Sequence, residues 1–370
     1  MARTIIGLND PKAVKKYAAT LAVDTARVSY WQRKFMGKGE DSPTPIQMLP
    51  HLENDAGEQI TYDLSVQLKM EPVEGDDTLE GQEEDLKFYT DAVYIDQLRG
   101  GVNTGGRMTR KRTIHNLRMI ARKRQSEWWG RVFDELFFMY GSGSRGVNAD
   151  YLFRSTYAGF ANNAFTAPDA EHQLYGGSAN SKASMTDADV FDLNLVNRAK
   201  TRAEVMGGGT QETPQIQPIM INGEEHYVVV MHPWQEYDLR TDTGVGGWMD
   251  LQKAAAASEG RNNPIFKGAM GMHNNVVLHS HKGVIRFSDY GAGSDVSAAR
   301  ALFLGRQAMV CAFGSPGSGL RFDWHEESRD NGNQAVITTS TIVGIKKCTF
   351  SAKDFGISAL DTAAKDKTST

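Results

Sequence analysis

Residues 71–85 read EPVEGDDTLEGQEED, and eight of these fifteen residues are acidic while none is basic. On their N-terminal side, residues 58–70 alternate apolar and polar side chains, which is the pattern of a half-buried strand. On their C-terminal side, residues 86–95 form a second strand-like run. Two strands joined by a charged connection predict an extended β-hairpin with an acidic tip.

A basic helix is predicted after the hairpin. Residues 100–106 are rich in glycine and predict a hinge, and apolar side chains then recur every three or four positions over residues 108–140. At a rise of about 1.5 Å per residue, this helix is about 48 Å long. Its first part carries nine Lys or Arg between residues 107 and 131, against one acid, Glu127. Gly141 and the glycines that follow it are expected to end the helix.

The acidic tip and the basic helix carry complementary charge in a chain whose net charge is only −4. A run of charge is often just a solvated face, and that interpretation stays open. An extended hairpin, however, points its tip away from its own base, so the two runs are expected to meet between identical copies. Such a head-to-tail contact closes rings or extends lattices, and exposed charge orients the subunits beforehand. The candidate contact residues are Glu74, Asp76, Asp77, Glu80, Glu83 and Glu84 on the hairpin, and Arg110, Arg112, Arg118 and Arg122 on the helix.

The N-terminal segment is also expected to contact a neighbouring copy. Residues 11–36 have the periodicity of an amphipathic helix. Residues 42–50 contain three prolines, which forbid regular helix and favour an extended arm. A helix followed by an extended tether suits a segment that lies on another molecule. Trp31 and Phe35 are therefore further candidate contact residues.

The rest of the chain mixes helix and strand patterns, which makes the predicted fold class α+β. Residues 141–185 are rich in small and polar residues and predict loops. The tail after Leu360 is expected to fray. The expected helices are 186–204, one that opens at His232, and 248–257, and the expected strands are 227–231, 276–281, 284–287, 301–313, 320–327 and 334–349.

Composition argues against several classes of protein. An apolar content of 40% and a charged content of 23% are ordinary for a globular protein, and the near-neutral charge argues against a freely diffusing DNA-binding protein. No run is apolar enough for a signal peptide or for the roughly 18 residues that span a bilayer, so no membrane partner is expected. Cys311 and Cys348 lie in apolar runs and are expected to be buried thiols rather than a disulfide or metal pair.

Motifs for catalysis are weak. Residues 141–146 match G-x-G-x-x-G, but a dinucleotide site needs a strand before and a helix after, and the pattern here is the reverse. His273, His279 and His281 are conceivable metal ligands, but no Cys or carboxylate follows at ligand spacing, so surface or interface histidines are expected. We expect no enzymatic activity, no catalytic residue, no cofactor and no metal. A solvated charged turn is the expected role of Asp323, Glu326, Glu327 and Asp330.

Ten short stretches of the sequence are informative through their order and spacing. They are FMGKG at 35–39, GEQITYDL at 57–64, TLEGQEE at 78–84, VYIDQLR at 93–99, GRM at 106–108, WW at 128–129, HP at 232–233, DL at 238–239, NPIFKGA at 263–269 and VVLH at 276–279. Each stretch is weak alone, and their order together is specific. In this order they resemble the major capsid proteins of tailed bacteriophages, in the subgroup typified by coliphage N-four. The resemblance covers residues from about 30 to 310.

The resemblance implies the Hong Kong 97 capsid fold, with an N-terminal arm, an extended β-hairpin loop, a peripheral domain with a long spine helix and an axial α/β domain. The implied domains are an arm at 1–57, the hairpin at 58–99, the peripheral domain at 100–185, the axial domain at 186–318, and strands returning to the peripheral domain with a tail at 319–370. Some relatives cross-link lysine to asparagine. Because no lysine lies between Lys69 and Lys87, no covalent cross-link is expected at the hairpin tip.

The implied function is a major capsid protein that self-assembles, in the host cytoplasm, into the icosahedral head shell around double-stranded DNA. The implied partners are other copies in pentamers and hexamers, a scaffolding protein, a portal, a decoration protein and the packaged DNA by non-specific contact. A separate scaffolding protein is expected because the arm already begins at Met1. Two alternatives stay open: a bacterial nanocompartment shell protein of the same fold, and a cytosolic enzyme that uses the histidines of residues 273–281.

Overall fold

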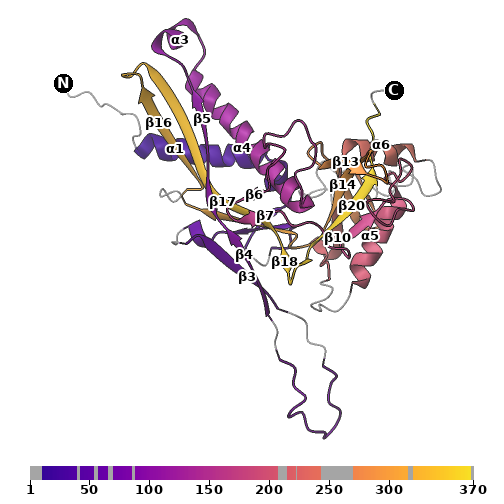
Figure 1. Ribbon diagram of the computed structural model, residues 1–370. Helices are drawn as coiled ribbons and strands as arrows, with labels where there is room; N and C mark the ends of the chain where they lie inside the picture. Colours follow the sequence, from indigo (N-terminus) through magenta and orange to yellow (C-terminus); the bar gives the residue numbers. More distant parts are fainter. Residues whose placement is uncertain are drawn as a thin grey trace.

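The structure is a computed structural model in which two sheets form the body of the molecule, and helices pack between and beside them (Figure 1). A long loop projects from one end of this body, and the short helix α3 (Arg107–Arg112) stands at the opposite end. The structure describes residues 11–39, 42–53, 57–65, 70–85, 88–206, 215–221, 223–242, 270–315 and 320–367.

A six-stranded sheet forms one half of the body. Its longest strand is β17, which pairs along one side with β15 and then β16, and along the other side with β5. The strands run in the order β1-β2-β15-β17-β16, with β5 joined to β17. Their bounds are β1 Met36–Lys38, β2 Ile46–Leu49, β5 Asp96–Asn103, β15 Met309–Gly314, β16 Phe322–Arg329 and β17 Gln334–Lys347.

An eight-stranded sheet forms the other half. Its central strand β10 is buried from His226 to Met231, as expected for a strand covered on both faces. The order is β11-β12-β10-β14-β20-β8, with β9 beside β10 and β13 beside β14. The bounds are β8 Gln173–Tyr175, β9 Ile219–Ile221, β10 Glu224–Met231, β11 Gly271–His273, β12 Val276–Ser280, β13 Arg286–Tyr290, β14 Val296–Leu304 and β20 Ile357–Ala363.

The helix α4 (Leu117–Ser142) joins the two sheets through one hydrophobic core. Its side chains Trp129, Phe133 and Phe137 have no exposed surface. They share a cluster with residues of both sheets, among them Val228 of β10. The opposite face of the eight-stranded sheet is covered by α5 (Leu193–Val205), while α6 (Pro233–Thr241) follows β10. The remaining helices are α1 (Pro11–Val28), α2 (Tyr30–Lys34) and the short 3-10 turn η1 (His51–Glu53).

A two-stranded hairpin leaves the body beside β5. Its strands are β3 (Gln59–Ser65) and β4 (Phe88–Tyr94), and residues 70–85 form the projecting loop between them. Two smaller pairs complete the described elements, β6 (Gly159–Phe160) with β7 (Asn163–Ala164), and β18 (Thr349–Phe350) with β19 (Lys353–Asp354). The predicted α+β class and the predicted hairpin are therefore confirmed.

Two long helices predicted from periodicity are each broken in the structure. The predicted helix at 11–36 is α1 and α2, because Ser29 leaves helical geometry and its side chain accepts a hydrogen bond from the Gln32 N–H. The predicted helix at 108–140 is α3 and α4, because Thr113 and Asn116 are extended and the Asn116 side chain caps α4. Side chains that satisfy backbone donors locally end a helix even where the apolar spacing continues.

Other predicted boundaries also shift. The predicted hinge at 100–106 is largely the second half of β5, and the predicted helix at 186–204 begins only at Leu193, after the cap Asp192. The predicted strand at 301–313 is split into β14, which ends at Leu304, and β15, which begins at Met309. Gly305 follows β14 at a point where a Cβ would lie 2.4 Å from the Gln217 carbonyl oxygen. The predicted helix at 248–257 lies outside the described residues.

Three segments predicted as an arm, a single strand and a frayed tail contribute to the two sheets of the body. The predicted extended arm at 42–50 supplies β2, whose residues are all buried inside the six-stranded sheet. The strand β15, which is the end of the predicted strand at 301–313, also joins the six-stranded sheet. The first residues of the predicted frayed tail, Asp361–Ala363, instead complete β20, which is buried along its whole length and pairs with β14. A buried strand needs both neighbours, and short apolar runs do not say which sheet provides them.

Candidate subunit-contact surfaces

The projecting residues 70–85, here called the acidic loop, present their charge to solvent. Glu74, Asp76, Asp77, Glu80 and Glu83 are exposed. Two tight turns shape the loop, in which the Asp77 N–H bonds to the Glu74 carbonyl at 3.3 Å and the Gln82 N–H bonds to the Leu79 carbonyl at 3.0 Å. The loop therefore has a local shape, and its carboxylates stand on the outside of it.

Glu84 differs from the other acids of the loop because it is half-buried. Its carboxylate accepts a hydrogen bond of 2.9 Å from the Met70 N–H and so joins the two ends of the loop. Gly75 and Gly81 have φ values of +62° and +88°, a region that glycine adopts without strain. Glu84 therefore acts within its own chain, whereas the other seven acids of the loop are exposed, although Glu83 also accepts a hydrogen bond of 2.7 Å from the Gly81 N–H.

The second surface is the basic elbow, here defined as residues 107–120, which comprises α3, a turn and the start of α4. It contains five Lys or Arg and no acid. The Arg107 N–H bonds to Asn333 Oδ1 at 3.0 Å and its Nε bonds to the Gly332 carbonyl at 3.2 Å. These bonds fix the base of the elbow to the turn between β16 and β17.

The predicted arginines of this helix have different environments. Arg112 is exposed at the end of α3, and Arg110 lies in the same helix. Arg118 is paired with the buried carboxylate of Glu326, which also accepts a hydrogen bond of 2.9 Å from the Trp324 indole. Arg122 is half-buried, and its Nε finds no acceptor among the described residues. The freely presented charge therefore sits on α3.

The elbow also exposes apolar side chains, which the sequence pattern did not predict. Ile114 falls within the predicted continuous helix at 108–140, but it lies in the turn between α3 and α4 and is 97% exposed. Met108, Met119 and Ile120 are also exposed. The signal that could have revealed the turn is the pair of capping residues Thr113 and Asn116.

The N-terminal contact residues are placed differently from the prediction. Trp31 and Phe35 have no exposed surface and pack within this chain. The Trp31 ring meets Phe138 of α4 edge-on at 5.0 Å, and the Phe35 ring meets His279 at 5.2 Å. The prediction that these two side chains contact a neighbour is therefore wrong for this structure, because the amphipathic face of the segment is buried against its own body.

A buried carboxylate holds α2 in place. Asp134 of α4 accepts hydrogen bonds from the Ser29 hydroxyl at 2.7 Å, the Tyr30 N–H at 3.0 Å and the Trp31 N–H at 3.2 Å. Burial raises the pKa of Asp134 to about 6, although these three bonds oppose the shift. The carboxylate thus satisfies the free donors at the start of α2.

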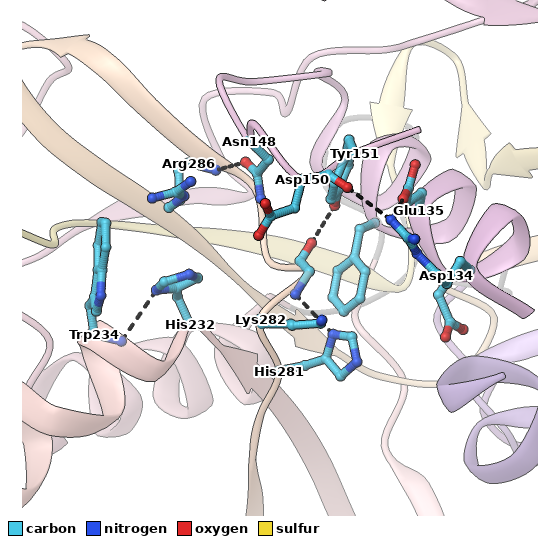
Figure 2. Close-up of a pocket in the computed structure, with 13 residues that line it drawn as sticks. Asp134, Glu135, Asn148, Asp150, Tyr151, His232, Trp234, His281, Lys282 and Arg286 are labelled. Atoms are coloured by element: carbon cyan, nitrogen blue, oxygen red, sulfur yellow. Dashed lines mark hydrogen bonds and ion pairs between the residues drawn. The ribbon is translucent and has the colours of Figure 1, made fainter. Parts of the chain in front are cut away.

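A cavity of about 310 Å³ lies beside Asp134, between α4 and the eight-stranded sheet. Figure 2 shows Arg286 and Trp234 at one end of it and Glu135 and Asp134 at the other. The Asn148 amide donates a hydrogen bond to the Val284 carbonyl at 2.9 Å, and the Asn148 side-chain oxygen accepts one from the Arg286 N–H at 2.8 Å. This lining residue therefore connects the segment after α4 to the eight-stranded sheet.

The histidines around this cavity are uncharged donors and acceptors. Burial lowers the pKa of His232 and of His281 to about 4. Each accepts a backbone N–H at Nδ1, from Trp234 at 3.2 Å and from Gly283 at 3.0 Å. His279 has no exposed surface, so the expectation of surface or interface histidines is wrong at that position.

The other residues considered for metal binding, dinucleotide binding or cysteine chemistry occupy the following places in the fold. His273 lies apart from the other histidines, with its Nε2 at 3.0 Å from Asn197 Oδ1, and the described residues contain no group of three His, Cys, Asp or Glu that could hold a metal. The G-x-G-x-x-G match at 141–146 covers the end of α4, where Gly143 adopts φ +70°. Cys311 and Cys348 are buried and unpaired, as predicted.

Comparison with known proteins accounts for this architecture. A family model described as phage capsid protein matches residues 5–366 of the chain. The chain belongs to this family. This capsid subunit is similar over its whole length to the capsid of Ralstonia phage GP4, with 50% identity, a TM-score of 0.86, and 99% of each chain covered.

More distant relatives agree. The capsid subunit is 26% identical over 349 residues to the major capsid protein of Pseudomonas phage KPP25, covering 88% of this chain and 89% of the relative. The capsid of cyanophage Pam1 shares the fold, with a TM-score of 0.69 at 19% identity over 89% of this chain and 91% of that one. The predicted Hong Kong 97-type fold is confirmed, and the capsid subunit is a major capsid protein of the virion. The narrower subgroup of coliphage N-four stays a prediction.

Among the described residues, no helix combines the length and the apolar character that crossing a bilayer requires.

Proposed function

We propose that this capsid subunit assembles, as pentamers and hexamers, into the icosahedral head shell that encloses the double-stranded DNA of a tailed phage. The observation that carries the proposal is the likeness to the capsid of Ralstonia phage GP4, at 50% identity over 99% of the chain. The role is structural and not enzymatic: the subunit binds further copies of itself and transforms no substrate.

The proposed contact between neighbouring copies joins the acidic loop of one to the basic elbow of the next. Figure 1 supports this arrangement because the loop and α3 lie at opposite ends of the molecule, so the two surfaces of one copy face away from each other. The exposed acids Asp76, Asp77 and Glu80 then lie near Arg112 and the other exposed cations of α3. Opposite charges of this kind orient two copies as they approach.

Further partners follow from the same role. We propose a scaffolding protein during assembly, a portal at one vertex, a decoration protein on the outer surface and the packaged DNA by non-specific contact with basic side chains. Each is an expectation from the shell function, and each is tested by purifying particles and identifying what they retain.

Electron microscopy of the purified protein tests the shell function, and the content of the particles separates it from the alternatives. Particles purified from the phage-infected host are expected to be uniform shells that hold nuclease-protected DNA. Shells that hold a cargo enzyme instead would favour a nanocompartment of the same fold. A soluble monomer with bound metal at His273 and His281 would favour an enzyme and contradict the proposal.

Charge reversal tests the proposed contact. The variant Asp76→Lys, Asp77→Lys, Glu80→Lys is expected to slow assembly at least about tenfold, since the loop then repels the elbow, while the circular dichroism of the unassembled subunit is unchanged. A matched control makes the same charge change at exposed acids elsewhere, Asp187→Lys, Glu225→Lys and Asp295→Lys. Normal shells from the loop variant would show that the positive charge of the elbow serves another partner, such as DNA.

A further inference from the structure

The basic elbow carries a cluster of exposed apolar side chains as well as charge. Ile114 is 97% exposed, Met119 62% and Ile120 43%, and Met108 of α3 is 62% exposed. Large apolar side chains exposed singly are ordinary on a protein surface, but several within one short segment mark a place that binds another surface.

The exposure of Ile114 is held by the backbone around it. Thr113 is extended, its hydroxyl accepts the His115 N–H at 3.2 Å, and the Asn116 side chain accepts the Met119 N–H at 3.3 Å. These bonds set a fixed turn with Ile114 at its apex. Because Arg107 fixes the other end of α3 by its hydrogen bond to Asn333, both ends of the segment that exposes Ile114 are held in place.

These apolar side chains distinguish between two partners for the positive charge. Phosphate groups are bound by cations and hydrogen-bond donors, and a bare isoleucine adds nothing to that contact. A protein surface gains roughly 25 cal/mol for each Å² of apolar area removed from water. The combination of positive charge with exposed apolar side chains therefore favours a protein surface over DNA as the partner of the basic elbow.

The acidic loop has the matching composition. It carries eight acids and no base, and it also exposes two large apolar side chains, Met70 and Leu79. Leu79, 48% exposed, lies in the turn closed by the Gln82 N–H, so its position is also set by the backbone. The acidic loop and the basic elbow thus carry opposite charge, and both also expose apolar side chains. They lie at opposite ends of one molecule (Figure 1).

We infer that an apolar anchor holds the contact between copies: Leu79 of one subunit packs on Ile114, Met119 and Ile120 of the next. The inference rests on the proposed loop-to-elbow contact and adds what sets its strength. The charges steer the approach and weaken as salt screens them, whereas the burial of Leu79 and Ile114 persists in salt. Ile114 is then the specificity-determining residue of the elbow.

Engineered cysteines test the anchor in assembled shells. The double variant Leu79→Cys, Ile114→Cys is assembled, treated with diamide as the oxidant and separated on a denaturing, non-reducing gel. A ladder of disulfide-linked subunits is expected, because each pair joins two copies. The native Cys311 and Cys348 are buried and do not interfere. The matched control pairs Leu79→Cys with Val23→Cys, an exposed position of α1, and is expected to stay monomeric.

The outcomes separate the anchor from the shell function. Shells without a ladder, or an equal ladder from the Val23 control, would overturn the anchor and leave the shell function intact. No shells from the unmodified protein when it is produced in the phage-infected host, where its assembly partners are present, would contradict the shell function itself. As a second measurement, Ile114→Ser is expected to raise the protein concentration needed for assembly at least about fivefold in high salt. An unchanged concentration would also overturn the anchor.

Discussion

The N-terminal helices and the acidic loop were both expected to lie on a neighbour, and the structure places them differently. The helices were expected there because they are amphipathic, and the loop because of its concentrated charge. The helices pack their apolar side chains against their own chain, with Trp31 buried and Asp134 accepting hydrogen bonds from the first N–H groups of α2. The loop projects, with Asp76, Asp77 and Leu79 facing solvent. A segment that leaves its side chains uncovered is the better candidate for contact with a neighbouring copy.

The largest effect that tests this comparison is expected from Trp31→Ala. Removing a fully buried tryptophan is expected to lower the free energy of unfolding by about 3–5 kcal/mol, because a cavity remains beside Phe138. Urea unfolding of the unassembled subunit measures it. The matched change Val23→Ala, at an exposed position of α1, is expected to have a small effect. If Trp31→Ala left stability unchanged and only impaired assembly, the arm would be an inter-subunit element after all.

A smaller effect is expected from the carboxylate that holds α2. The pKa of Asp134 is raised to about 6, so the folded state binds this proton more tightly than the unfolded state. Its contribution to stability is therefore largest at low pH and falls as pH rises from about 4 to about 6, by on the order of 2–3 kcal/mol. Asp134→Asn keeps one acceptor oxygen and is expected to flatten this part of the pH profile.

The measurement is the difference in unfolding free energy between the two proteins at each pH, which removes the contributions of other titrating groups. Glu135, whose pKa is also raised by burial, remains in both proteins and cancels. A difference that is constant between pH 4 and pH 7 would show that Asp134 titrates at its ordinary pKa. Asp134→Ala removes both carboxylate oxygens that accept hydrogen bonds from the start of α2, and it is expected to destabilise the subunit across this pH range.

Two arginines of the basic elbow are expected to give smaller effects on stability, and they differ in whether they pair within their own chain. Arg118 pairs with the buried Glu326, so Arg118→Ala leaves that carboxylate with less compensation and is expected to cost about 1–2 kcal/mol of stability. Arg112 is exposed, and Arg112→Ala is expected to change stability by less than about 0.5 kcal/mol while slowing assembly. Thermal unfolding and light scattering measure the two properties. The reverse ranking would show that Arg118 is the residue that meets the neighbour.

The sequence predicted those elements whose residue pattern and position agree. The alternation at 58–70 predicted β3, the run at 334–349 predicted β17 within two residues, and the periodicity after residue 117 predicted α4. The pattern failed where a local hydrogen bond competes with it. Ser29 and Asn116 each end or begin a helix through one side-chain bond, which leaves the apolar spacing unchanged.

The candidate contact residues were predictable from charge and not from apolar pattern. Acids concentrated in one short segment repel one another and stay in solvent, so the exposure of Asp76 and Glu80 follows from composition. An amphipathic segment, in contrast, must bury its apolar face, and its sequence does not say whether in its own chain or in another. Trp31 was therefore predicted to contact a neighbour, although it is buried in its own chain. Ile114 was included in a continuous helix, although it is exposed in a turn.

The smallest effect on stability, and the sharpest test of the comparison, is expected from Leu79→Ala. Leu79 lies in a projecting loop and touches solvent, so the variant is expected to change the free energy of unfolding by less than about 0.5 kcal/mol. The same change removes apolar area from the proposed contact and is expected to raise the concentration needed for assembly several-fold. Sedimentation of a dilution series measures assembly, and urea unfolding measures stability on the same samples. A loss of stability as large as that of Trp31→Ala would mean that the loop, like the N-terminal helices, is held by its own chain.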